Sequence, residues 1–314
     1  MNLLSSMRYL VALSEHKHFG RAAEACHITQ PALSNAIKAL ELELGATIVR
    51  RDRHFVGLTS EGERVLASSH VMLREQALLM HELQGDKDGP SGDIRIGAVP
   101  TAMGIAVRFG ASLQAQYRGI TPKVFSMSSD HLESGLADLS LDLALGYIDR
   151  TNIPVGKLSR WPQYNEHYFL LRRAKKSKGK LLQLGPIIGW RDAGVMPLCL
   201  LTADMHNRAI IDAAFTTVGL HVVPAMEVNS SFSMPMCVSD GDLCSILPGT
   251  LLANVLHLTH LEALPLSSPQ VVTPIGFMAH ASTRPSRAMQ AAIAWLTSDA
   301  WLSKARLYSN PLQL

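Results

Sequence analysis

Four polar side chains recur at helical spacing in the stretch QPALSNAIK, at Gln30, Ser34, Asn35 and Lys38. The amides of Gln30 and Asn35 can each form paired hydrogen bonds with the edge of an adenine, whereas Ser34 and Lys38 suit phosphate groups. This chemistry is recognition of a nucleic acid and not bond cleavage. The spacing therefore predicts a helix with a DNA-reading face, and an ordinary helix with a solvated polar face is the alternative.

A helix-turn-helix would position these side chains. Apolar spacing predicts a first helix over residues 3–15 and a second from Phe19 to Cys26, before the helix that carries the polar face. His27 stands where the chain must reverse, and His is one of the few residue types enriched at positive φ. Thr29 can cap the following helix, and Pro31 suits its first turn, where a missing N–H costs nothing.

A basic tip follows within the stretch IVRRDRHFVGLT at 48–59. Its apolar flanks predict two short strands, and Arg50, Arg51, Arg53 and His54 lie between or beside them. Residues 1–85 contain nine Lys or Arg and nine Asp or Glu, so this part of the chain is neutral as a whole. We therefore expect the positive charge of the tip to contact the DNA backbone locally.

The stretch RAAEACHITQPALSNAIKALELELGATIVRR, with LTSEG after it, resembles the winged helix-turn-helix of the LysR-type transcriptional regulators. The order of later segments matches that family along nearly the whole chain. The resemblance implies two partners, double-stranded promoter DNA and RNA polymerase. The DNA contacts it implies are Gln30, Pro31, Ser34, Asn35, Lys38, Arg50, Arg51 and Arg53. Asn35 stands where many members carry Arg, so the operator sequence cannot be copied from a relative.

A long helix over residues 60–84 is predicted next. Ser60 and Glu63 match the pattern of a capping box, and apolar residues recur every seven positions from Val65 and from Leu66. At 1.5 Å per residue the helix would be about 38 Å long. The small helix-turn-helix domain before it cannot cover the apolar residues along that whole length. We therefore expect it to pair with a second chain. A helix folded back on its own domain is the alternative.

From Ile94 onward, strand-like and helix-like segments alternate, which argues for a parallel α/β sheet. A second such set follows, and the last strand and helix rejoin the first set. This region resembles the family's two-lobed effector domain, which is similar to periplasmic binding proteins. The fold class is thus α/β with an N-terminal all-α winged helix-turn-helix. The expected parts are 1–59 (DNA-binding domain), 60–84 (linker and dimerisation helix), 85–92 (hinge) and 93–314 (effector domain, with lobe I at about 93–162 and 268–314 and lobe II at about 163–267).

Polar side chains gather where the predicted strands end and helices begin, which is where open α/β sheets bind ligands. Free N–H groups and helix dipoles there favour an anion, so we expect a small carboxylate or oxyanion as effector. The expected contacts are Pro100, Thr101, Ala102, Met103, Ser128, Ser129, Thr202 and Asn229. Ser and Thr at such places are also ordinary helix caps, which is the alternative. Arg150 and His167 are candidates for a charged clamp.

Composition and motifs limit the other classes of function. The chain is 47% hydrophobic and 18% charged and has no run of 18 apolar residues, so we expect a cytoplasmic protein without a membrane partner. No catalytic or nucleotide-binding motif is present, and the thirteen His residues show no ligand spacing. We expect neither an enzyme nor a bound cofactor or metal.

Four cysteines leave one alternative within the same family, a thiol-based redox-sensing regulator. Some relatives switch through cysteines in the effector domain, where this chain carries Cys199, Cys237 and Cys244. A sensor thiol needs an exposed, electropositive setting, whereas Cys199 and Cys244 lie inside apolar runs. The sequence therefore favours a regulator that is gated by a small metabolite and assembles as a homodimer or homotetramer.

Overall fold

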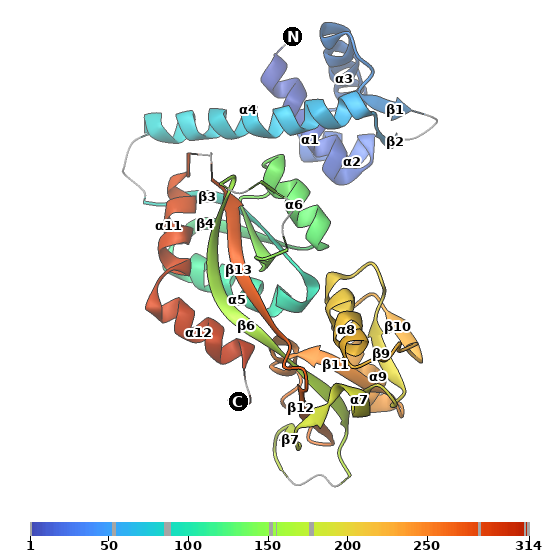
Figure 1. Cartoon of the computed structure of the whole chain (residues 1–314). Helices are drawn as coiled ribbons and strands as arrows, with labels where there is room; N and C mark the ends of the chain where they lie inside the picture. The colour runs from blue at the N-terminus through green and yellow to red at the C-terminus, as the bar shows by residue number, and fades with distance from the viewer. Residues whose placement is uncertain are drawn as a thin grey trace. The chain divides into compact units, whose positions relative to one another are not determined.

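The computed structural model describes residues 2–51, 55–84, 89–150, 153–154, 156–175, 179–281, 284–310 and 312 (Figure 1). The chain forms two compact units, one of Met1–Asp88 with Ala137–Ser140 and the other of Gly89–Leu136 with Leu141–Leu314. Each unit is described below by itself. Over the described ranges, no helix is both long and apolar enough to span a lipid bilayer.

The first unit is a helical head with a two-stranded wing and a long helix. Its elements are α1 (Leu3–His16), α2 (Phe19–Ala25), α3 (Gln30–Leu44), β1 (Val49–Arg51), β2 (Phe55–Leu58) and α4 (Ser60–Gln84). Leu10, Leu13, Leu33 and Ile37 are completely buried in the core that the first three helices share. Complete burial of such a side chain stabilises the fold by about 1.5–3 kcal/mol. The predicted helix-turn-helix and wing are confirmed.

The turn between α2 and α3 follows the local chemistry expected of it. His27 has a φ of 56°, as the required reversal of the chain predicts. The side chain of Thr29 accepts a hydrogen bond from the backbone N–H of Ala32 at 3.4 Å, and Pro31 lies in the first turn. Gly45, with a φ of 64°, ends α3 in the left-handed region that glycine adopts without strain.

The cap of α4 differs from the one predicted. Ser60 already has helical conformation, and Thr59 accepts the hydrogen bond from the N–H of Gly62 at 2.9 Å. The hydroxyl of Thr59 also donates to the backbone oxygen of Thr47 at 2.6 Å, which ties the helix start to the chain entering the wing. The capping box of Ser60 and Glu63 is therefore wrong, because that extra bond fixes the helix start one residue earlier.

Lobe I of the second unit is built on a five-stranded sheet. Its strands are β3 (Ser91–Ala98), β4 (Gly119–Ser126), β5 (Leu143–Tyr147), β13 (Val272–His280) and the first part of β6 (Leu158–Arg173). Its helices are η1 (Pro100–Ala102), α5 (Met103–Gln116), α6 (Ser129–Ala137), α11 (Arg287–Leu296) and α12 (Asp299–Ser309). Phe109 centres the core, with its ring centroid 4.6 Å from that of Phe277 and 5.1 Å from that of Trp301.

Lobe II is a second sheet with an apolar core on each face. Its strands are the second part of β6, β7 (Gln183–Leu184), β8 (Ile188–Gly189), β9 (Leu198–Leu201), β10 (Met226–Val228), β11 (Cys244–Pro248) and β12 (Leu261–Ser267). Its helices are α7 (Trp190–Ala193), α8 (His206–Thr217), α9 (Met234–Asp240) and α10 (Gly249–Leu252). Trp190 and Phe215 meet edge to face in one core, and Phe169 and Leu247 lie in the other.

Strand β6 belongs to both sheets, as its long green ribbon shows in Figure 1. His167 is paired with Val272 of β13 in lobe I, and the next residue, Tyr168, is paired with Pro248 of β11 in lobe II. The crossing therefore lies later than the boundary expected near residue 162. It was not visible in the sequence because the strand continues without a break.

Two further expectations need correction. The sheets are mixed and not wholly parallel: β3 is parallel to β4 and β5, and β9 to β10 and β11, but β6 and β13 run antiparallel to their neighbours. The expected hinge at 85–92 is also too long, because Ser91 and Gly92 already pair with β4. Residues 85–88 lie outside the described ranges.

Candidate nucleic-acid interface and ligand cleft

Helix α3 separates a buried face from a polar one. Leu33, Ile37 and Leu40 are completely buried. The predicted contacts on the other face are exposed in the case of Gln30, Pro31, Asn35 and Lys38 and half-buried in the case of Ser34. The structure therefore brings all five to the accessible side of the helix. Their contacts with DNA stay a prediction.

The wing is described only in part. Arg50 is exposed on β1, which pairs with β2 from Val49 opposite Leu58. Arg51 belongs to the same strand, but its side chain lies outside what the structure describes, as does all of Arg53. Arg50 is thus the wing residue whose exposure agrees with a role at the DNA backbone.

A histidine that the sequence reasoning missed fixes the start of α2. Nδ1 of His18 accepts hydrogen bonds from the backbone N–H groups of Gly20, at 3.1 Å, and Arg21, at 3.3 Å. The Arg21 guanidinium donates to the backbone oxygen of His16 at 3.0 Å. Oε1 of Gln30 lies beside the same turn, 3.4 Å from where a side chain on Gly20 would begin. These contacts place the start of α2 close to the start of α3.

A cavity of about 10 Å³ lies between lobe I and lobe II, with room for about one water molecule. Lobe I contributes the β3–α5 connection, the start of α6 and the end of β5, and lobe II contributes the end of β9 and the start of α8. The lining residues are Val99, Pro100, Thr101, Ser128, Ser129, Tyr147, Leu201, Met205, His206 and Asn207. The lobes are therefore nearly closed upon each other here.

Several polar atoms at this cavity are buried without a hydrogen-bond partner in the described part of the chain. They are Oγ of Ser129 and both Nδ2 and Oδ1 of Asn207, while Oγ1 of Thr202, which follows the lining residue Leu201, is a further such atom beside the cavity. A buried polar group left unpaired costs about 1–3 kcal/mol, so most such groups in folded proteins have a partner. A cluster facing one cavity is typical of a site that receives a water molecule or a ligand.

Glu166 lies deeper, on β6 next to the lobe crossing, and is completely buried. Neither of its carboxyl oxygens has a partner with hydrogen-bonding geometry among the described residues. The hydroxyls of Thr101, Tyr168 and Thr250 are its polar neighbours and lower its pKa, but burial is the larger effect and raises the pKa to about 8. The carboxyl group is therefore mostly neutral at pH 7.

The charged groups near the cavity are already paired. The Arg150 guanidinium donates to Asp130 at 2.5 Å and to Glu133 at 3.2 Å. The hydrogen bond and charge of Arg150 lower the pKa of Asp130. Burial, and then the charge of Arg150, lowers the pKa of His206, whose ring lies edge-on to Tyr147 with centroids 4.6 Å apart. Arg150 is thus held by two carboxylates and does not line the cavity.

The structure brings half of the expected effector contacts to this cavity, namely Pro100, Thr101, Ser128 and Ser129. The other four do not line it. Ala102 is buried in the lobe I core, Met103 packs against that core, Thr202 is half-buried with its hydroxyl oxygen buried, and Asn229 is exposed. His167 lines a separate cavity of about 420 Å³ beside Arg306.

The sequence reasoning missed Tyr147, Met205, His206 and Asn207. Helix α8 begins at His206, and no side chain caps it. The signal for Tyr147 was available, because it ends the apolar, strand-like stretch LALGY, and open α/β sheets bind ligands beyond the carboxyl ends of their strands.

Curated relatives match the chain over part of its length. The hydrogen peroxide-inducible genes activator of Dickeya chrysanthemi and the transcriptional dual regulator OxyR of Escherichia coli K12 are each 39% identical over 98 residues, 31% of this chain. The match spans about a third of the length of each of these relatives, 32%. An SDS degradation transcriptional activation protein of a Pseudomonas species is 35% identical over 175 residues, 52% of this chain and 55% of its own.

Solved structures match nearly the whole chain. A full-length OxyR variant from Pseudomonas aeruginosa superposes with a TM-score of 0.69 and 24% identity, over 93% of this chain and 96% of its own. The regulator CbnR in complex with its target DNA superposes with a TM-score of 0.63 and 16% identity, over 96% of this chain and 99% of its own. At these identities the likeness establishes the fold.

Two family models match the two units in turn. The model for bacterial regulatory helix-turn-helix proteins of the lysR family matches residues 4–63, and the model for the LysR substrate binding domain matches residues 87–301. The second match alone covers more than half of the chain. This chain therefore belongs to the LysR family of bacterial transcriptional regulators.

Proposed function

We propose that the chain is a sequence-specific DNA-binding regulator gated by a small carboxylate or oxyanion held between its two lobes. The observation that carries this proposal is the group of buried, unpaired polar atoms on Ser129 and Asn207, which line the closed cavity, and on Thr202 beside it. The first belongs to lobe I and the other two to lobe II. A carboxylate or oxyanion ligand requires the lobes to lie slightly further apart than they do here. One that satisfies atoms on both sides binds such a nearly closed arrangement better than a fully open one, and only such a difference can shift the equilibrium.

An anionic group suits the cavity for two reasons. The N-terminal ends of α6 and α8 both reach it, and each helix dipole favours a negative charge there by about 0.3–1 kcal/mol. Glu166, whose pKa is raised to about 8, is mostly uncharged at neutral pH and does not repel an anion. Ser128 already caps α6, because its Oγ accepts from the N–H of His131 at 3.3 Å, so Ser129 is the more available hydroxyl.

Helix α4 supports assembly with a second copy. Leu66 is buried against the head, and Val65 packs partly against it, so the alternative of a folded-back helix accounts for the first turns. Further along, the stripe is exposed at Met72, Leu79, Met80 and Leu83. Exposed apolar side chains at such spacing are typical of a helix that pairs with another. A homodimer or homotetramer would set two DNA-reading heads at a fixed spacing on promoter DNA, where RNA polymerase is the further partner we propose.

A redox-sensing regulator is the second candidate, because two relatives are named for hydrogen peroxide induction or OxyR. The thiols of Cys199 and Cys237 lie close enough to affect each other. However, burial chiefly, together with Cys237, raises the pKa of Cys199 to about 12, and burial also raises the pKa of Cys244. A thiol with a raised pKa provides little of the reactive thiolate. The small-molecule proposal is therefore the better supported.

Thermal-shift screening of the full chain against short carboxylates, phosphate and sulfate tests the proposal. A true effector stabilises the protein by RT ln(1 + [L]/Kd). Ser129→Ala and Asn207→Ala should each weaken the affinity for the effector about tenfold. Thr216→Val, on the exposed side of α8, serves as the matched control. Equal stabilisation of all variants, or of none including the natural chain, would oppose an anion site in the cleft.

The redox alternative has its own test. A variant with Ser at Cys199, Cys237 and Cys244 should bind promoter DNA as the natural chain does, before and after exposure to hydrogen peroxide. A peroxide-dependent change in DNA binding that the Ser variant loses would establish the redox alternative instead.

A further inference from the structure

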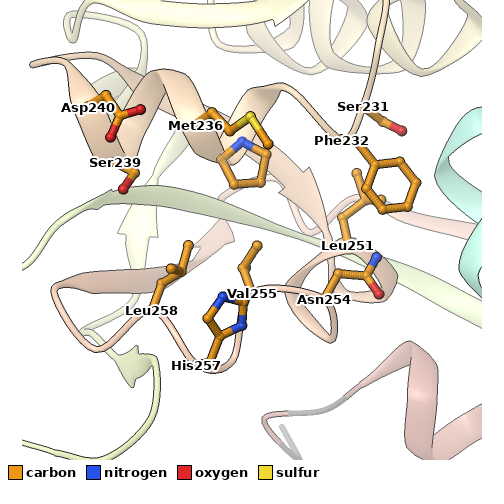
Figure 2. A pocket seen from close by; sticks show the side chains of 11 residues that line it. Ser231, Phe232, Met236, Ser239, Asp240, Leu251, Asn254, Val255, His257 and Leu258 are labelled. Carbon is orange, nitrogen blue, oxygen red and sulfur yellow. The ribbon is translucent and has the colours of Figure 1, made fainter.

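A further cavity, larger than the cleft, lies inside lobe II and shares no lining residue with the cleft (Figure 2). Its volume is about 280 Å³. Helix α9 and the turn before it form one side, and the segment at 251–258 forms the other. The apolar walls are Phe232, Pro235 and Met236 on the first side and Leu251, Val255 and Leu258 on the second.

Two large apolar side chains at this cavity remain open to water. Phe232 is 56% exposed and Met236 is 63% exposed, whereas Leu251 and Val255 on the facing side are buried. Figure 2 shows Met236 on the helix above and Val255 on the segment below, with the cavity between them. An apolar body placed there would remove both exposed side chains from water, which is favourable in proportion to the area covered.

One buried polar atom of the lining is still available for a ligand. Nδ2 of Asn254 is buried and has no hydrogen-bond acceptor among the residues that the structure describes. The other inner hydroxyls are already engaged: Ser231 donates to the backbone oxygen of Pro100 at 3.1 Å, and Ser239 is paired with His260 at 2.8 Å. A ligand acceptor next to Asn254 would satisfy a donor that is otherwise costly to bury.

The opposite end of the cavity limits the charge of the ligand. Figure 2 shows the Asp240 carboxylate at the end away from Asn254. Asp240 is exposed, and a negative charge there disfavours an anionic occupant without supplying a buried partner for a cation. The observations therefore favour an uncharged molecule.

From this geometry we infer that the lobe II cavity is a second ligand site, for an uncharged small molecule with an aromatic or alicyclic body and one hydrogen-bond acceptor. This site differs from the proposed effector cleft in position and in ligand chemistry. Its position gives it a way to act on the cleft. Ser231 lines the cavity and bonds to Pro100, and Thr250, next to Leu251, donates to the backbone oxygen of Thr101 at 3.0 Å. Pro100 and Thr101 both line the cleft.

Calorimetric titration of the full chain with two matched probes tests this inference. The probes are 1-tetralone, which carries a carbonyl acceptor, and tetralin, the same body without it. We expect one 1-tetralone bound per chain, about tenfold more tightly than tetralin, because only the ketone pairs with Nδ2 of Asn254. Asn254→Leu should abolish the difference between the probes while tetralin still binds.

Two substitutions at the exposed rim complete the design without disturbing the core. Phe232→Ser and Met236→Gln should each weaken the binding of 1-tetralone about tenfold, since each removes apolar area that the probe covers. Val223→Gln, which is 80% exposed in the same lobe but does not line the cavity, should leave the affinity unchanged.

The cleft variants Ser129→Ala and Asn207→Ala keep this test separate from that of the effector cleft. They should leave 1-tetralone binding unchanged, whether or not an anion binds the cleft. The inference is overturned if 1-tetralone fails to bind the natural chain up to its solubility. It is equally overturned if the rim variants bind the probe normally, or if the cleft variants lose it.

Discussion

Thr250 of lobe II donates its hydroxyl hydrogen to the backbone oxygen of Thr101 in lobe I at 3.0 Å, and both side chains are buried. Together with the bond from Ser231 to Pro100, this contact joins lobe II to the segment of lobe I that lines the effector cleft. The two bonds form only when the lobes lie as close as they do here, so they favour the closed arrangement.

Loss of that contact should loosen the cleft. Thr250→Val keeps the shape of the side chain but removes the donor, at a cost of about 0.5–1.5 kcal/mol for a typical hydrogen bond. We expect amide hydrogen exchange at Thr101 and Ala102 to become roughly 2- to 13-fold faster. Thr216→Val, exposed on α8, should leave it unchanged. Equal exchange in all three proteins would mean that the contact does not hold the lobes together.

Stability should depend on pH through Glu166. Its pKa is raised from the usual 4.5 to about 8, so the folded chain binds more protons than the unfolded chain between these values. Stability should therefore fall as pH rises from about 4.5 to about 8, by up to about 1.4 kcal/mol per pH unit. The surrounding Tyr147, Tyr164 and Tyr168 have pKa values raised above 10.0, chiefly by burial, and stay protonated over this range.

Glu166→Gln provides the test, because the amide resembles the protonated acid and does not ionise. The variant should match the natural chain in denaturant unfolding near pH 5 and exceed it near pH 9. An anionic effector should also bind the natural chain less tightly above pH 8, where the carboxylate forms, and the Gln variant should lose that dependence. A stability difference that is the same at both pH values would contradict an ionising Glu166.

The DNA-reading face should divide into sequence-specific and nonspecific contacts. Asn35→Ala removes an amide suited to an adenine edge, so it should cost about 1–3 kcal/mol on the natural operator and relax preference at one base pair. Lys38→Ala should weaken binding to all DNA sequences alike. It should also reduce the steepness with which the logarithm of the DNA-binding constant falls with the logarithm of salt concentration by about 1. Lys304→Ala, on α12, is the charge-matched control. Identical effects of the Asn35 and Lys38 variants on operator and random DNA would oppose these roles.

Assembly should depend on the outer part of α4. Leu79 is 55% exposed in the single chain, and Leu79→Glu would place a charge in the proposed helix pair. We expect sedimentation to show dissociation to smaller species and weaker binding to a two-site operator. Leu184→Glu, at a residue of lobe II that is 46% exposed, makes the same chemical change elsewhere and should keep the assembly. Dissociation of both variants alike would point to a general loss of folding.

The features predicted best from the sequence are those set by local chemistry. The φ of His27, the cap at Thr29 and the place of Pro31 in the first turn of α3 depend on residues within a few positions, and the structure has them as predicted. The alternation of strands and helices in the second unit was equally readable. By contrast, the cap at Thr59 depends on a bond to Thr47, twelve residues away, which no local pattern reveals.

The proposed effector cleft was less predictable because it is assembled from segments far apart in the chain. Ser129 and Asn207 meet one cavity only after both lobes have folded, so nothing near either residue distinguishes it from an ordinary helix start. Glu166 is the clearest case. Within its strand it looks like a surface carboxylate, and only the packing around β6 removes it from water. The cavity in lobe II depends in the same way on contact between separate segments.

The continuity of β6 limits how the effector domain can move. The strand passes from one sheet into the other between His167 and Tyr168 with ladder partners on both sides of that point. Rotation of one lobe relative to the other must therefore twist β6 along its length, because no loop interrupts the strand where it crosses between the sheets. We therefore expect the lobes to rotate relative to each other through only a small angle when a ligand binds, and to return to their original arrangement when it dissociates.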